Sequence, residues 1–107
     1  MAGRANAVES AWMGRVAAVG CVMCMIQGIT QSGRTTVHHI KEGTGIGERS
    51  QHYLTVALCE EHHQGANGIH GLGTKGFYLR YRVDEIDLLS LTIERVFSAM
   101  RNELARR

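Results

Sequence analysis

The chain has 107 residues, and its formal net charge of +2 and pI of about 8.6 make it weakly basic. This length predicts a single domain over residues 1–107 with a modest hydrophobic core. The charge permits nucleic-acid binding but does not by itself predict it. We see no continuous apolar stretch typical of a signal peptide or a membrane span, so we expect a cytoplasmic protein without a membrane partner. Three cysteines in such a chain favour metal binding over a disulfide framework.

The first half of the chain predicts one helix followed by two short strands. Apolar residues spaced by four, four and three predict a helix over residues 7–19, and they are Val8, Trp12, Val16 and Val19. Gly20 suits the left-handed position after a helix end, and Cys21-Val-Met-Cys24 is expected to form a tight turn. The β-branched segment 35–40 and the apolar segment 53–58 predict strands, with a glycine-rich connection between them.

The second half predicts a short helix, a loop and two C-terminal helices. Glu60 and Glu61 favour a helix start, because acidic side chains match the positive end of the helix dipole. Four glycines in residues 65–73 predict an irregular loop that carries His70. Thr74 and Asp84 can cap helices within about 74–106. The last helix has an apolar stripe that we expect to pack on the core, with a dimer seam as the alternative; it comprises Ile86, Leu88, Leu89, Ile93, Val96, Phe97 and Met100.

Two pairs of residues with metal-ligand spacing predict a structural zinc site. Cys21 and Cys24 form a C-x-x-C pair, and Cys59 and His62 have the same spacing at a strand-to-helix junction. Together they make a Cys₃His set, which suits a closed tetrahedral zinc site. A redox-active C-x-x-C would need a βαβ context, which the predicted elements do not provide.

The other histidines predict a second metal site. Neighbours on a helix point about 100° apart, so His63 faces away from the site that His62 serves. His38 and His39 alternate across a strand and can act together only if the strand ends, bulges or twists there. His70 can reach back from its loop as a further ligand. A histidine cluster apart from the thiolates is typical of an open, reactive metal position.

These motifs resemble those of a known nuclease family. HHI at residues 38–40, a strand that ends in Leu58-Cys59, and the HH pair at residues 62–63 resemble the HNH (ββα-metal) endonuclease motif. More narrowly, CVMC, HHIKEGTGIGERSQHYLTVALCEEHHQG and GIHGLGTKGF resemble the phage recombination-enhancement (Ref-like), RecA-dependent nucleases, from about Arg15 to Leu89. The resemblance implies a small α+β, zinc-stapled ββα-metal domain: an N-terminal helix at about 7–19, the ββα-metal core at about 35–70, and C-terminal helices at about 74–106.

The resemblance also implies a role for each histidine. By the family pattern His38 and His63 bind the catalytic metal, His39 is the general base, and His70 is a third ligand or a phosphate contact. The structural zinc then takes Cys21, Cys24, Cys59 and His62. The asparagine of the HNH name is not at its expected place, and we expect His52 or Gln51 to orient His39 instead.

The implied function is a metal-dependent DNA endonuclease linked to recombination. It would use a histidine base and one divalent ion (Mg²⁺, Mn²⁺, Zn²⁺ or Ni²⁺) besides the structural zinc. The expected partners are DNA, whether single-stranded, duplex or a recombination intermediate, and a RecA filament, with the protein a monomer or a homodimer. Candidate contacts to the DNA backbone are Arg34, Lys41, Arg49 and Lys75. The alternatives are a non-catalytic zinc module that binds DNA or a recombination protein, and a metal-storage or sensing cluster.

Overall fold

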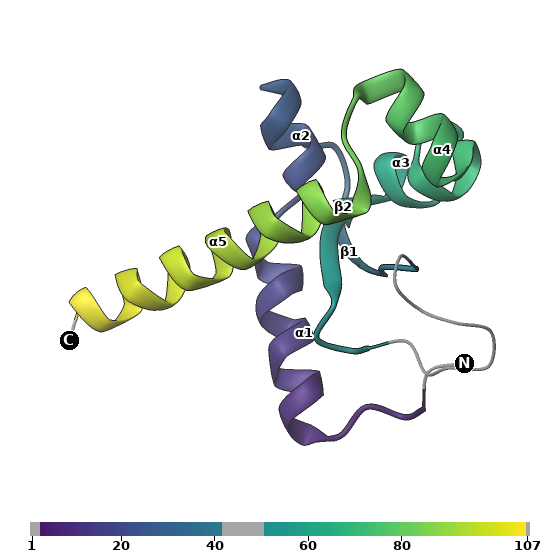
Figure 1. Cartoon of the computed structure of the whole chain (residues 1–107). Helices are drawn as coiled ribbons and strands as arrows, with labels where there is room; N and C mark the ends of the chain where they lie inside the picture. Colours follow the sequence, from purple (N-terminus) through teal and green to yellow (C-terminus); the bar gives the residue numbers. More distant parts are fainter. Residues whose placement is uncertain (1–2, 42–50, 107) are drawn as a thin grey trace.

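The computed structural model of the chain describes residues 3–41 and 51–106 (Figure 1). The elements in chain order are α1 (Ala7–Val19), α2 (Val22–Gln27), β1 (Thr35–His39), β2 (Thr55–Cys59), α3 (Glu60–His63), α4 (Ile69–Tyr81) and α5 (Glu85–Ala105). The small α+β class predicted from the sequence is confirmed.

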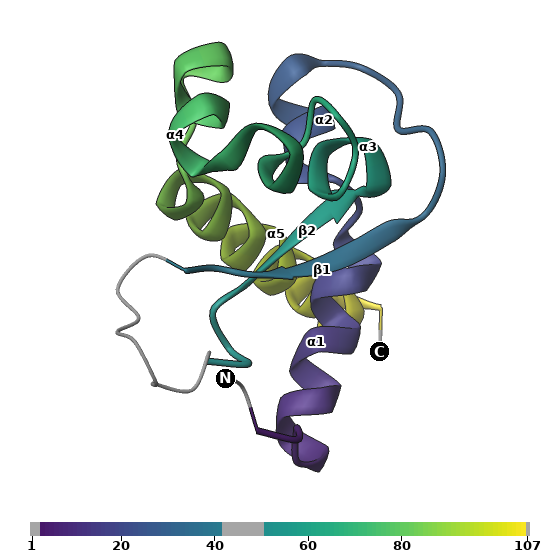
Figure 2. The same cartoon turned by 90° about the vertical axis from the view of Figure 1, so that its right-hand side faces the viewer.

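The two strands form an antiparallel pair at the centre of the molecule. Thr35 pairs with Cys59 at one end and His39 with Thr55 at the other, and α3 starts directly after Cys59. All five residues of β2 are buried, because α1, α2, α3 and α5 all contact this strand. Figure 2 shows α3 and α4 together on one side of the strand pair. The order along the chain is therefore strand, strand, short helix.

Helix α1 joins the sheet to α5. Asn6 and Glu9 form a capping box at its start, in which each side chain accepts a hydrogen bond from the other's backbone N–H. Val16 is buried and packs in one cluster with Ala57 of β2 and Val96 of α5. The half-buried Trp12 donates from its indole nitrogen to the carbonyl oxygen of Tyr53 at 3.1 Å. Of the predicted apolar repeat, Val16 belongs to this cluster and Trp12 and Val19 pack against it, whereas Val8 is 66% exposed.

The stretch Ala7–Gln27 is long and apolar enough to cross a membrane, by length and a mean hydropathy of 1.3 alone. Such composition is weak evidence, because core helices of globular proteins share it. In the structure this stretch is two helices, separated at Gly20, whose φ is 91°. Val22, Met23 and Cys24 of α2 lie buried in the main core. The stretch is therefore interrupted at Gly20, and its second helix is part of the core.

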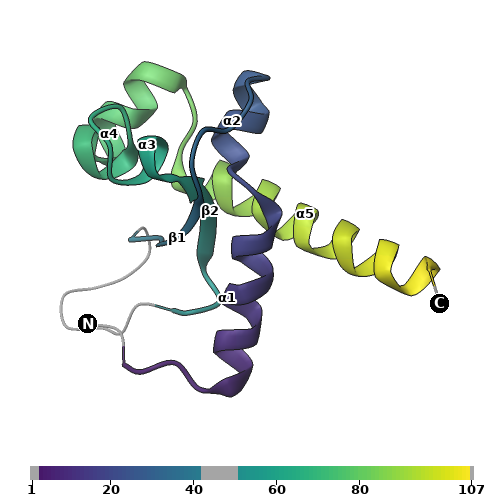
Figure 3. The same ribbon diagram turned by 180° about the vertical axis from the view of Figure 1, so that it is seen from behind.

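Helix α5 follows its predicted cap but only part of its predicted stripe. Asp84 and Asp87 form a capping box at its start. The face on the core carries Leu88, Leu89, Thr92 and Val96, all buried. Ile86 and Phe97, which the sequence assigned to the stripe, are 46% and 59% exposed. Figures 1 and 3 show that α5 crosses α1 and then runs out from the body of the molecule.

Two predicted local structures are wrong. Cys21-Val-Met-Cys24 is not a tight turn but the first turn of α2, and the Cys21 sulfur accepts from the Cys24 N–H at 3.4 Å. The glycine-rich residues 69–72 are not an irregular loop but the first turn of α4, which breaks only at Gly73 (φ 77°). The glycines serve close packing instead. A Cβ at Gly71 would lie 2.4 Å from the carbonyl oxygen of Gly65.

Candidate metal centres

Four side chains with metal-binding atoms meet where α2, β2 and α3 join. Cys21 is the N-cap of α2 and Cys24 lies in its first turn, Cys59 ends β2, and His62 lies on α3. All four are buried, and their ligand atoms lie within 4.8 Å of one another. We refer to these residues as the cysteine group.

The distances within the cysteine group fit a tetrahedral zinc ion. With Zn–S near 2.3 Å and Zn–N near 2.0 Å, two sulfurs should be about 3.8 Å apart, and a sulfur and a nitrogen about 3.5 Å. The Cys24 and Cys59 sulfurs are 3.9 Å apart. The Nδ1 atom of His62 lies 3.5, 3.5 and 3.3 Å from the sulfurs of Cys21, Cys24 and Cys59. The residues therefore fit the ion.

The electrostatics of the cysteine group point the same way. Burial raises the pKa of the Cys21 thiol, and burial together with the neighbouring cysteines raises the pKa of Cys24 to about 12. Thiolates this close together need a cation between them. Burial lowers the pKa of His62, which keeps its imidazole neutral and able to bind a metal.

A second set of ligands lies on the other side of α3. His38 from β1, His63 from α3 and His70 from α4 place one ring nitrogen each within 4.8 Å of the others. Their ring centroids are 4.8–5.1 Å apart, at tilted or edge-on angles. His38 and His63 are buried, whereas His70 is exposed. We refer to these three residues as the histidine group, and its exposed side is suited to a substrate.

Two members of the histidine group, His63 and His70, have lowered pKa values that favour the neutral imidazole. Burial, with His38, His70 and His39 nearby, lowers the pKa of His63 to about 4. Burial and His38 also lower the pKa of His70. Neutral imidazoles keep their lone pairs for a metal near neutral pH, and a set of nitrogen ligands with an open side suits a transition metal.

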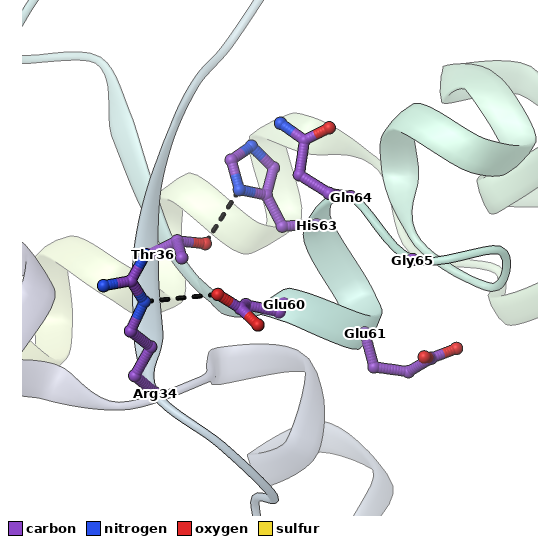
Figure 4. A pocket seen from close by; sticks show the side chains of 7 residues that line it. All are labelled: Arg34, Thr36, Glu60, Glu61, His63, Gln64 and Gly65. Atoms are coloured by element: carbon purple, nitrogen blue, oxygen red, sulfur yellow. Dashed lines mark hydrogen bonds and ion pairs between the residues drawn. The ribbon is translucent and has the colours of Figure 1, made fainter.

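The structure adds two residues beside the histidine group that the sequence reasoning did not include. Thr36 Oγ1 lies 2.7 Å from His63 Nδ1 (Figure 4). Glu85, at the start of α5, places Oε2 2.7 Å from His38 Nε2. Glu85 is 47 residues from His38 in the chain. In the sequence it is only one more acidic residue in a first helical turn, so no local signal reveals it.

His39 stands outside the histidine group. It is the last residue of β1 and pairs with Thr55 of β2. Its Nε2 lies 3.0 Å from His52 Nδ1, and His52 Nε2 lies 2.7 Å from the carbonyl oxygen of Gly3. Burial, then His52 and His38, lower the pKa of His39. The predicted contact between His52 and His39 is thus present.

Three of the four predicted DNA contacts lie in the described part of the chain. Arg34 lines an open pocket of about 500 Å³ with Thr36 and His63, and its Nε pairs with Glu60 Oε1 at 3.2 Å (Figure 4). Lys41 lines a pocket of about 270 Å³ with members of the histidine group. Lys75 is exposed on α4. Arg49 and the rest of residues 42–50 fall outside the described residues.

A model of the family described as "recombination enhancement, RecA-dependent nuclease" matches residues 5–96. This range contains both groups of ligands, as well as Thr36, His39, His52 and Glu85. No curated protein and no solved structure matches the chain.

Proposed function

The chain belongs to the family of recombination-enhancement, RecA-dependent nucleases, and from that premise we propose that it is an HNH-type DNA endonuclease with a histidine base and one divalent metal. The observation that carries the proposal is the division of the histidines. His62 joins the cysteines, three others converge on an open position, and His39 lies next to that position in the chain but outside it. A purely structural zinc module has no need of the second set.

The histidine group is the site proposed for the catalytic metal. A divalent ion bound there would polarise the scissile phosphate and stabilise the leaving oxygen. Burial holds the imidazoles of His38 and His63 in place, and His70 is the exposed third ligand, so the group stays open on its side. Imidazole ligands bind a metal in their neutral form, so they would add no negative charge at the cation, which favours an anionic phosphate.

His39 is the proposed general base, and its hydrogen bonds indicate which nitrogen acts. The carbonyl oxygen of Gly3 can only accept, so His52 carries its proton on Nε2. A neutral His52 then accepts at Nδ1 from His39 Nε2–H. This leaves the lone pair of His39 on Nδ1, where it can take a proton from the attacking water. His52 thereby does the orienting work that the sequence assigned to it or to Gln51.

Positive side chains around the histidine group are the proposed contacts to DNA. Arg34 and Lys41 line the pockets on its two sides, and Lys75 lies on the exposed face of α4. The exposed ion pair of Arg34 with Glu60 is weak enough to open for a phosphate. Such contacts position a DNA backbone without reading its sequence.

A nicking assay tests the proposal. Purified protein should convert supercoiled plasmid DNA to the nicked form with Mg²⁺, Mn²⁺, Zn²⁺ or Ni²⁺, alone or with RecA-coated DNA. His39→Ala should lower cleavage by about 10²–10⁴-fold, as expected for a general base, with unchanged zinc content. Unchanged cleavage by this variant would refute the base assignment. DNA binding without cleavage under every metal would instead support the non-catalytic zinc module.

A further inference from the structure

We propose that Glu85 and Thr36 hold His38 and His63 in opposite tautomers, so that His38 presents Nδ1 and His63 presents Nε2 to the metal. Both would be positioning residues, since each acts through a histidine. The inference rests on the proposed function, in that it concerns the same metal site. It assigns roles to two residues that the sequence motifs do not contain.

Glu85 determines the proton position on His38. The side chain is buried, and its Oε2 lies 2.7 Å from His38 Nε2. Its carboxylate oxygens also accept from the backbone N–H of Lys41, at 3.1 and 3.3 Å. A carboxylate only accepts, so the proton of a neutral His38 lies on Nε2. The free lone pair is then on Nδ1.

Thr36 places the proton of His63 on the other ring nitrogen, Nδ1. Its hydroxyl donates to the carbonyl oxygen of Leu58 at 2.8 Å, which uses its single proton. Toward His63 Nδ1, 2.7 Å away, the hydroxyl can therefore only accept. The proton of His63 lies on Nδ1 and the free lone pair on Nε2. Figure 4 shows the Thr36 oxygen against one ring nitrogen of His63, with the other nitrogen turned away.

The two contacts give the site a fixed geometry before metal arrives. Thr36 and His38 lie two residues apart on β1 and so share a face of the strand. Glu85 reaches that face from the start of α5, and Thr36 is itself tied to β2. A ligand histidine that donates its other N–H to a carboxylate is also a more basic ligand. Glu85 therefore strengthens His38 as well as orienting it.

Nitrogen NMR of histidine-labelled protein, with one equivalent of zinc for the cysteine group, reads the tautomers directly. We expect the protonated nitrogen to be Nε2 in His38 and Nδ1 in His63. Further zinc should shift the signals of His38 Nδ1 and His63 Nε2, the two unprotonated atoms. The reverse assignment of either ring would overturn the proposal.

Metal affinity separates a tautomer effect from a loss of packing. Glu85→Ala and Thr36→Val should each weaken binding of the second zinc ion by about 10–100-fold in competition titrations. Glu85→Gln and Thr36→Ser should restore most of the affinity, because each keeps an acceptor for the same ring proton. Glu94→Gln, an exposed charge loss on the same helix, should leave it unchanged. Wild-type affinity in the first two variants, or no rescue by the second two, would refute the proposal.

These readouts do not depend on cleavage. A protein with the expected tautomers and affinities that cuts no DNA would refute the proposed nuclease chemistry and leave the positioning roles intact. A protein that cuts DNA with the reverse tautomers would refute the positioning roles alone.

Discussion

His62 and His63 are neighbours in the chain that serve different groups of ligands. Both lie on the single turn of α3, where successive side chains diverge by about 100°. His62 Nδ1 faces three sulfurs, and His63 faces His38 and His70. The four-residue helix α3 thus separates the cysteine group from the histidine group. Any change in the angle of α3 moves a ligand of each.

The depressed pKa of His63 predicts how stability depends on pH. Its pKa is about 4 in the folded protein and near 6.5 in the unfolded chain. Between these values the unfolded state binds more protons, so stability falls as pH drops below about 6.5 and levels off below about 4. Denaturant unfolding across this range should show a shallower decline for His63→Gln, which takes up no proton.

Zinc release from the cysteine group at low pH affects wild type and His63→Gln alike. The quantity to compare is therefore the slope of the free energy of unfolding against pH. Identical slopes for wild type and His63→Gln, at equal zinc content, would contradict the assigned pKa shift. Adding metal to the histidine group should extend the wild-type decline below about pH 4, because protons and metal compete for the lone pair of folded His63 only near and below that pH.

At the scale of elements, glycines allow the first turn of α4 to pack closely against the preceding backbone. A Cβ at Gly68 would lie 2.6 Å from the carbonyl oxygen of Glu61, and one at Gly71 would lie 2.4 Å from that of Gly65. These contacts bring the first turn of α4 against α3. His70, within that turn, is thereby brought to His63.

Gly71→Ala should displace the first turn of α4. The added methyl group meets backbone atoms, which cannot rotate away, so we expect a loss of about 1–3 kcal/mol in the free energy of unfolding and weaker metal binding by the histidine group. Gly14→Ala is the matched control. It lies within α1 with no heavy atom within 4 Å of its Cβ, and should stabilise the protein by about 0.5–1 kcal/mol. Chemical denaturation measures both, and equal stabilities for the two variants would contradict the packing role of Gly71.

The sequence predicted those features that depend on local spacing. The repeat of α1, the strand pair, the acidic start of α3 and the Asp84 cap each follow from a few neighbouring residues, and the structure agrees. The structure also brings together the two C-x-x-C/H pairs in one group and the predicted metal-binding histidines His38, His63 and His70 in another, while His39 lies outside both. Features that depend on tertiary contact were missed. Glycines in 65–73 looked like loop residues because their backbone neighbours are invisible in the sequence, and Glu85 reaches His38 only through the fold.

For the whole molecule, the cysteine group is the junction between distant parts of the chain. It ties α2 to the end of β2 and to α3, across a sequence separation of 41 residues between Cys21 and His62. It also adjoins the main core, in which Cys21, Cys24 and Cys59 are packed with Val22, Met23 and Leu58. A structural zinc ion contributes about 10–16 kcal/mol of binding free energy, against a typical domain stability of about 5–15 kcal/mol. The ion would therefore decide whether the domain folds.

Removal of zinc should unfold the domain and empty the histidine group together. After exhaustive chelation, or in Cys24→Ser, we expect loss of the cooperative thermal transition, because the buried thiols that remain and His62 would lose the binding free energy of the cation that joins them. Because α3 carries both His62 and His63, loss of the zinc ion should also weaken binding of the second metal by the histidine group. His70→Ala is the control: it removes a ligand of the histidine group only and should keep one zinc per chain and a cooperative transition. Calorimetry with metal counting tests this, and a cooperative transition at the original temperature in the zinc-free protein would show that the core holds the fold alone.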